Sequence, residues 1–312
     1  MPSERLQRVT NRSWPGARAT PQSVQSANST ARWLSLALVL LALGIATTSI
    51  LGPVGLGLMR YRTSQTTLNQ LLGSDAASLF VVAPLTIAAA ALTVRRHPVG
   101  PLVALGVGVY ALYTYAQVII GQEYLRLPGN VERFFPLLLT VFLAAEAVVV
   151  LAWRLAPATP RPAPRLERTA AVVLLLVAAF LVFGQHLRPM LTAWRDPAAL
   201  TEYASSPTPF WMVKLMDLGI IVPAAVCTAV GLLKGAAWAR RAMYVLVTGY
   251  TCLAIAVAAM ALVMYANADP DASLGLAGGF VFFALAFATL TVLLYWPLFG
   301  RSASEGSGGR VS

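Results

Sequence analysis

The sequence predicts an all-α integral membrane protein of eight transmembrane helices with both termini in the cytoplasm. Three observations lead to this prediction: the composition, the length of the apolar runs, and the distribution of basic residues over the loops. Of the 312 residues, 58% are hydrophobic and 11% are charged, whereas a soluble domain is about half apolar and carries about a quarter charged residues. The composition therefore excludes an ordinary soluble domain.

The apolar runs set the number of spans. A helix needs roughly 20 mostly apolar residues to cross about 30 Å of hydrocarbon, and the chain has eight such runs. A transmembrane β-barrel would instead show segments of about ten residues that alternate between apolar and polar. The predicted spans are residues 33–58, 76–94, 101–121, 134–153, 169–187, 210–233, 242–266 and 274–299.

Basic residues set the predicted orientation. Lys and Arg are concentrated in the N-terminal segment and after the second, fourth, sixth and eighth spans, and loops rich in them stay in the cytoplasm. The opposite loops hold fewer arginines, diluted by acids that include Asp75, Glu123 and Asp269. We therefore expect an N-in, C-in protein of the cytoplasmic (inner) membrane. The preference for Arg over Lys and the abundance of Ala are consistent with a bacterial source.

The chain divides into two sets of four spans. We expect a disordered cytoplasmic tail over 1–31, helices 1–4 over 32–153, a Pro-rich linker over 154–168, helices 5–8 over 169–300, and a second tail over 301–312.

A 4+4 parallel repeat is one explanation of this division. Placing Pro84 on Pro223 also places Ser78 on Asp217 and Arg95 on Lys234. Chance similarity between apolar segments is the alternative, and the sequence leaves both open.

The charge and the motifs narrow the range of partners. The net charge of +11 is spread over short loops, where it favours anionic lipid headgroups at the cytoplasmic face over nucleic acid. His97 and His186 lie on opposite sides of the predicted membrane, so they cannot share a metal or haem. The HExxH, GxSxG and Walker A motifs are absent. We therefore predict no cofactor or metal, while protein partners stay unknown.

Three ionisable side chains fall inside predicted spans: Glu146, Lys214 and Asp217. Each costs about 2.5–3.5 kcal/mol at a helix centre, so such residues usually face a bundle interior. Lys214 and Asp217 are i,i+3 neighbours that could form an ion pair, and Lys214, about 6 Å deep by helical rise, could also extend outward to water. The pair could merely orient its helix, or Asp217 could face an outward cavity as a proton acceptor or cation ligand.

The third span offers a polar face to this helix. Tyr110, Tyr113 and Gln117 follow one helical stripe. Tyr113 and Asp217 lie at similar depths, about 12 and 10 Å below the outer boundary, so we expect a contact between them. Interhelical hydrogen bonding that only stabilises the bundle is the alternative. Glu146 lies deeper, at the level of Tyr250 and Thr251 of the seventh span, and a protonated Glu146 could donate a hydrogen bond to either. Such a carboxyl suits a proton relay and equally a neutral structural acid, and the sequence leaves both open.

These residues lead to three hypotheses of function. The first is small-solute or proton-linked transport or binding through an outward cavity between the third, sixth and seventh helices. The second is a structural or assembly subunit of a membrane complex, without transport activity. A membrane-embedded enzyme that acts on lipid ranks third, because an acid and a tyrosine alone are few groups for catalysis.

Overall fold

The architecture is known from a computed structural model, which describes residues 21–157 and 162–307. Within these ranges the chain forms helices joined by turns and loops, and no strand. Eight of the helices are long and apolar enough to cross a membrane, so the predicted number of spans is confirmed. This is the architecture of a multi-pass membrane protein.

The first four spans consist of continuous and compound helices. They are α1 (Pro21–Leu51); α2 (Gln65–Ala77), η1 (Ser78–Val82) and α3 (Ala83–Val94); α4 (Val99–Ile120); and η2 (Val131–Phe134) with α5 (Phe135–Leu155).

The last four spans are built in the same way. They are α6 (Pro164–Ala179), η3 (Phe180–His186) and α7 (Leu187–Arg195); α9 (Pro207–Met216), η5 (Asp217–Ile221) and α10 (Val222–Leu233); α11 (Ala237–Ala266); and α12 (Leu274–Ser307). Between α7 and α9 lie the short helices η4 (Pro197–Ala199) and α8 (Thr201–Ser205).

Several helices are longer than their apolar runs. The fifth span continues to Arg195, because Leu187, Leu191 and Trp194 recur at helical spacing within a partly polar segment. The second span begins at Gln65, where the Ser64 side chain caps it by accepting a hydrogen bond from the Thr67 amide.

Residues at the expected tails are partly helical. Residues 21–31 form the start of α1 and residues 301–307 the end of α12, although the sequence analysis assigned both to disordered tails. Residues 1–20, 158–161 and 308–312, which belong to the expected tails and linker, lie outside the described part of the chain.

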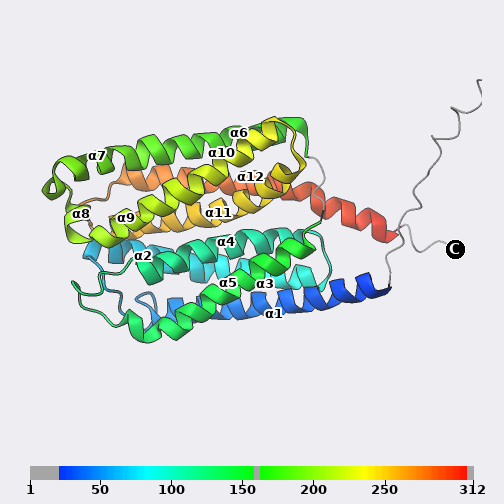
Figure 1. Cartoon of the computed structure of the whole chain (residues 1–312), viewed down its shortest axis with the longest axis horizontal. Helices are drawn as coiled ribbons and strands as arrows, with labels where there is room; N and C mark the ends of the chain where they lie inside the picture. The colour runs from blue at the N-terminus through cyan, green and yellow to red at the C-terminus, as the bar shows by residue number, and fades with distance from the viewer. Residues whose placement is uncertain (1–20, 158–161, 308–312) are drawn as a thin grey trace, which may run out of the picture.

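The helices form two groups that follow the order of the chain (Figure 1). In the first group, α1 and α4 each pack against both α3 and α5. In the second group, α10 packs against α6 and α11, and α11 packs against α12. The Phe180 ring of η3 contacts Phe280 and Phe283 of α12. The groups meet where α11 packs against α2 and α4, and where α4 packs against α9.

Glycines allow the close approach of helices where the two groups meet. A Cβ atom on Gly73 of α2 would stand 2.4 Å from the backbone of Met260 in α11, and one on Gly106 of α4 would stand 2.4 Å from the Thr248 side chain. Small residues at such crossings let helix backbones come together in membranes, where apolar lipid gives little hydrophobic drive for association.

Three spans contain a π-helical turn, namely η1, η3 and η5, in the described part of the chain. Each turn ends two or three residues before a proline, respectively Pro84, Pro189 and Pro223. A proline has no amide N–H, and its ring crowds the carbonyl four residues earlier. The wider turn relieves this conflict by moving the hydrogen bonds to i→i−5, as from the Val222 amide to the Asp217 carbonyl.

The turns that follow α3 and α10 have the same backbone hydrogen bonds. Arg96 donates to the Thr93 carbonyl at 3.0 Å, and Gly235 donates to the Leu232 carbonyl at 2.9 Å. The amides of residues 95, 97 and 100 in the first turn donate to the corresponding carbonyls as the amides of residues 234, 236 and 239 do in the second turn. The residues that correspond are those brought together by placing Pro84 on Pro223.

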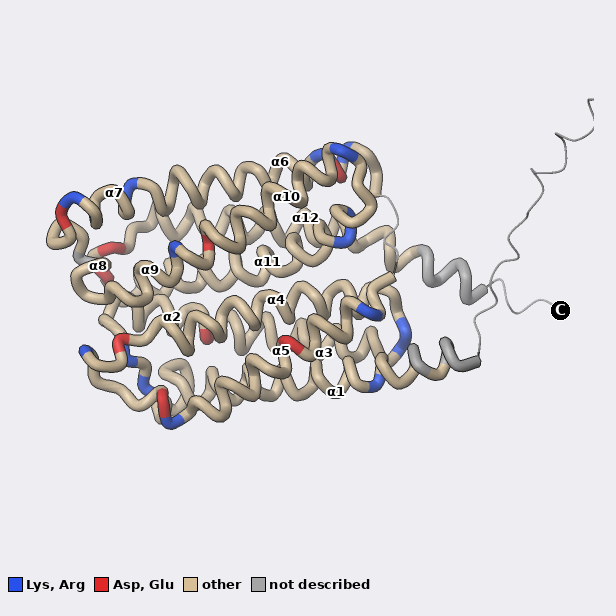
Figure 2. Tube along the Cα trace, viewed as in Figure 1, with Lys and Arg blue, Asp and Glu red and all other residues tan. Residues whose placement is uncertain are grey.

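Charged residues gather near the two ends of the bundle (Figure 2). We call the end that holds the turns after α3, α5 and α10 the arginine-rich end; it carries Arg95, Arg96, Arg154, Lys234, Arg240 and Arg241. The opposite end holds the loops between α1 and α2, between α4 and η2, between α7 and α9, and between α11 and α12.

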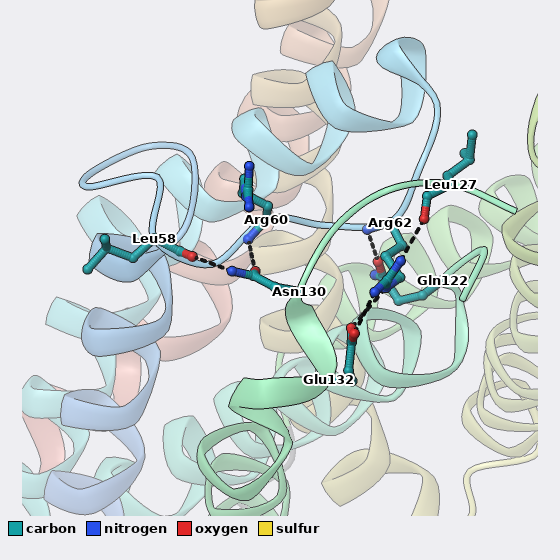
Figure 3. A network of polar contacts seen from close by, with 7 residues as sticks. All are labelled: Leu58, Arg60, Arg62, Gln122, Leu127, Asn130 and Glu132. Carbon is teal, nitrogen blue, oxygen red and sulfur yellow. Dashed lines mark hydrogen bonds and ion pairs between the residues drawn. The ribbon is translucent and has the colours of Figure 1, made fainter. Parts of the chain in front are cut away.

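A polar network ties two loops together at the opposite end (Figure 3). Asn130 accepts a hydrogen bond from the Arg60 amide at 2.7 Å and donates one to the Leu58 carbonyl at 3.0 Å. Arg62 forms an ion pair with Glu132 at 2.5 Å. The hydrogen bond to Glu132 raises the pKa of the Arg62 guanidinium, which stays charged. The network holds the α1–α2 connection against the start of the fourth span.

The close contact at Gly73 leads to a prediction. Gly73→Ala should lower the stability of the folded protein by about 1–3 kcal/mol, the usual cost of inserting a methylene group into a packed site, because the obstructing atoms are backbone atoms of α11. Thermal unfolding of the purified protein in detergent measures this change. Gly278→Ala is the matched control, since a Cβ atom there meets nothing within 4 Å. Equal stability of the two variants would contradict the packing of α2 on α11.

Candidate functional site

Asp217 lies at the centre of a buried polar cluster. It is the first residue of η5, and its side chain is buried. The Tyr113 hydroxyl of α4 donates a hydrogen bond to Asp217 Oδ1, and His186 Nε2 lies 2.8 Å from Oδ2. Both carboxylate oxygens therefore have a partner on another helix. The predicted contact between Tyr113 and Asp217 is confirmed.

His186 is the residue that sequence reasoning missed. The sequence analysis placed it at the outer end of a helix ending near Leu187, but that helix continues for eight further residues to Arg195. His186 is consequently buried, at 5% exposure. It is the last residue of the π-helical turn η3, which contacts η5. The amphipathic pattern of α7 was the sequence signal that could have placed His186 inside the bundle.

The second ring nitrogen of His186 has no hydrogen-bond partner. Nδ1 is buried, and no described residue provides a donor or acceptor for it. Buried polar atoms without a partner are uncommon in folded proteins and often belong to a site where a ligand or water completes the bonding. His186 Nδ1 is thus the atom of the cluster at which a further hydrogen bond can form.

Lys214 does not form the predicted ion pair with Asp217. The partner of Asp217 is His186. The Lys214 ammonium instead lies 3.4 Å from the centroid of the Phe210 ring, one turn earlier in α9, an arrangement favoured by the negative ring face. The side chain is 6% exposed, so the alternative expectation, an extension into water, is also wrong.

The tyrosines of the α4 stripe form hydrogen bonds with residues in different groups of helices. Tyr113 bonds Asp217 of the second group, whereas Tyr110 bonds the Ser78 hydroxyl of the first group at 2.9 Å. Gln117 lies one turn beyond Tyr113 and is half-buried. From α11, Tyr250 donates a hydrogen bond to the Ile221 carbonyl at the end of η5, at 2.8 Å. Tyr113 and Tyr250 thus both contact the turn that holds Asp217.

Glu146 does not meet Tyr250 or Thr251. Its side chain is exposed on α5, and no described residue hydrogen-bonds to it. Tyr250 bonds the Ile221 carbonyl, and Thr251 bonds the Val247 carbonyl and Thr291. The prediction failed because depth fixes only the position along a helix, while the face of α5 is set by its packing on α1 and α4.

Three acids assigned to the loops are buried. Asp75 belongs to α2 and accepts a hydrogen bond from the Tyr61 hydroxyl at 2.9 Å. Glu123 accepts one from the Thr208 amide at 2.7 Å, and Asp269 accepts one from the Asn69 side chain at 2.8 Å. Only Asp75 lies well inside a span, and its partner is a neutral phenol.

No group of three or more His, Cys, Asp or Glu side chains in the described ranges could hold a metal ion. Asp217 and His186 alone are too few for a metal site with protein ligands. A carboxylate beside an imidazole is an acid–base pair of side chains that can exchange a proton.

The comparisons with known proteins identify no relative of this chain. Neither protein-family models, nor curated proteins, nor solved structures give a match to this chain. The interpretation of Asp217, His186 and Tyr113 consequently depends on their chemistry alone.

The bond between Tyr113 and Asp217 can be measured by a double-mutant cycle. Tyr113→Phe should lower stability by about 1 kcal/mol, the range found for hydrogen bonds between membrane helices. In an Asp217→Asn background the same change should cost less, because the charged acceptor is already gone. Thermal unfolding in detergent at constant pH provides the four values. Tyr265→Phe, at an exposed site on α11, should be neutral, and strictly additive effects would contradict the contact.

Proposed function

We propose that this chain is a proton-linked transport or binding protein for a small solute, with Asp217, His186 and Tyr113 as the groups that hold the proton. The observation that carries the proposal is the buried pairing of Asp217 with His186 at 2.8 Å. Ionisable residues in membrane spans are costly, and they mark proton and substrate pathways in many membrane proteins.

The pair of Asp217 and His186 can bind and release one proton. When the pair is protonated, an imidazolium lies beside a carboxylate and the cluster is neutral. When the proton leaves, the cluster carries one negative charge in a region of low dielectric, where that charge is expensive. Binding of a cation, or entry of a new proton, would restore neutrality. Such a change of net charge is what couples a proton to a second ligand.

The open nitrogen of His186 and the π-helical turns support this proposal. Nδ1 is buried without a partner among the described residues, so a water or a solute can hydrogen-bond there. His186 and Asp217 also end and begin π-helical turns, and such turns occur frequently at functional sites because their backbone bonds are easily rearranged.

The proposed orientation has both termini in the cytoplasm. It is supported by the concentration of Arg and Lys at the arginine-rich end, which would face the cytoplasm of a cell with this protein in its inner membrane. The Asp217 cluster would then lie nearer the outer side, because Asp217 is closer to the start of α9 than to the end of α10.

A 4+4 parallel repeat is also part of the proposal. It is supported by the matching backbone hydrogen bonds after α3 and α10, and by π-helical turns that begin at the aligned residues Ser78 and Asp217. Parallel repeats are related by an axis along the membrane normal. The ionisable cluster belongs to the second half alone, because Ser78 occupies the matching position in the first.

A second candidate is an assembly subunit of a membrane complex. It is favoured by Glu146, whose side chain is exposed on the outer face of α5. A carboxyl facing lipid is costly, and a helix of another membrane protein that offers a hydrogen-bond donor would remove that cost.

Proton movement tests the first proposal. The full chain is reconstituted into liposomes that contain a pH-sensitive dye, and an inside-negative potassium diffusion potential is applied. We expect proton entry above that of protein-free liposomes, and a loss on the order of tenfold or more in Asp217→Asn and in His186→Gln, since a missing acid–base group has at least such effects. Glu146→Gln is the matched control and should behave as the unmodified protein. Unchanged entry in Asp217→Asn would exclude the cluster from the mechanism.

Co-purification tests the second candidate. A partner that binds at Glu146 should be lost from Glu146→Leu and retained by Glu146→Gln, because an amide still forms hydrogen bonds whereas leucine does not. Native mass spectrometry of the protein extracted from its own membrane measures the bound partner. The same subunit in both variants would show that Glu146 does not bind it.

A further inference from the structure

A cavity of about 740 Å³ lies at the arginine-rich end, between the start of α1 and the end of α3. Arg32 of α1 and Arg96 of the turn after α3 both line it, together with the side-chain amides Gln25 and Asn28. Tyr113, His186 and Asp217 are not among the residues that line this cavity. It is therefore independent of the proposed proton site.

Among the described residues, the side chains that line the cavity include two positive charges and no acid. Within the described ranges, Arg32 and Arg96 have no ion pair with an acid. Two guanidinium groups and two amides therefore present several N–H donors to one space, which suits an oxyanion with several acceptor oxygens, such as a phosphate group.

The backbone conformation of Arg96 is a second, independent observation. Arg96 has a φ of 56°, in the left-handed region that residues with a Cβ atom rarely adopt. The matching turn after α10 has Gly235 at this place, with a φ of 71°. Glycine adopts this conformation without steric cost. An arginine at a position where glycine suffices indicates that its side chain serves a purpose.

The lining of the cavity is also partly apolar. Leu36 and Val94, which border the polar residues, are 59% and 69% exposed. Exposed aliphatic side chains on membrane helices face the lipid chains. A ligand that fits this cavity has a phosphate group for the arginines and hydrocarbon for Leu36 and Val94, as a phospholipid does.

We infer that the cavity between α1 and α3 binds an anionic phospholipid, with Arg32 and Arg96 holding its phosphate group. An anionic lipid is favoured over a zwitterionic one, because a headgroup ammonium would lie near two guanidinium groups. The site would fix the start of α1 to the end of α3 through the lipid.

Lipid-dependent stability tests this inference. The full chain is purified in detergent, and its thermal unfolding is measured with added phosphatidylglycerol, with phosphatidylcholine, and with inorganic phosphate. We expect phosphatidylglycerol alone to raise the unfolding temperature, since a ligand that binds the folded state stabilises it by mass action. Native mass spectrometry should show a bound phosphatidylglycerol. A full shift with inorganic phosphate would overturn the lipid assignment in favour of a free phosphate ligand, and equal shifts with both lipids would overturn the anionic site.

Arg96→Gly is the decisive variant. It should unfold at the same temperature as the unmodified protein, or higher, without lipid, because glycine relieves the left-handed backbone; but it should lose the shift caused by phosphatidylglycerol. Arg32→Gln should lose the shift as well. Arg95→Gln is the matched control, since Arg95 is adjacent and exposed but does not line the cavity, and it should keep the shift. A full shift in Arg96→Gly would overturn the inference; if that variant is not obtained folded, Arg96→Gln provides the same comparison.

Discussion

Polar groups inside the bilayer depend on the protein itself for hydrogen-bond partners, because lipid chains offer neither donors nor acceptors. The helices meet most of this need with their own backbone bonds. Before Pro84, Pro189 and Pro223 the chain widens into a π-helical turn, and at η5 a side chain from a neighbouring helix supplies a further bond, from Tyr250 to the Ile221 carbonyl. These prolines therefore mark where the helices widen, while other polar contacts between helices, such as that of Thr248 with Tyr295, form away from the π-helical turns.

Helix α4 forms side-chain hydrogen bonds with both groups of helices, and it does so from one face. Tyr110 bonds Ser78 in the first group, and Tyr113, one turn further, bonds Asp217 in the second. Ser78 and Asp217 each begin a π-helical turn. The same local geometry thus holds a hydroxyl pair in one half and an acid paired with an imidazole in the other, where His186 contacts Asp217. This asymmetry is why the proposed proton chemistry belongs to the second half.

The two ends of the bundle carry different kinds of polar structure. At the opposite end, Arg62 and Glu132 satisfy each other and tie two loops together. At the arginine-rich end, Arg32 and Arg96 line a cavity that has no acid among its described residues, and Arg96 holds an unfavourable backbone conformation. The ion pair of Arg62 stabilises a connection between loops, whereas Arg32 and Arg96, which have no acid partner in the described ranges, are the arginines to which we assign anion binding.

The sequence by itself determined the number of spans, the basic character of alternate loops and the depth of Tyr113 and Asp217, because these depend on composition and on rise along a helix. Only the tertiary structure decided which side chains meet. Helix rotation sends Glu146 outward and brings His186 to Asp217 in place of Lys214, and rotation is set by packing between helices. The continuation of α7 past Leu187 likewise rests on an amphipathic pattern that a count of apolar residues does not register.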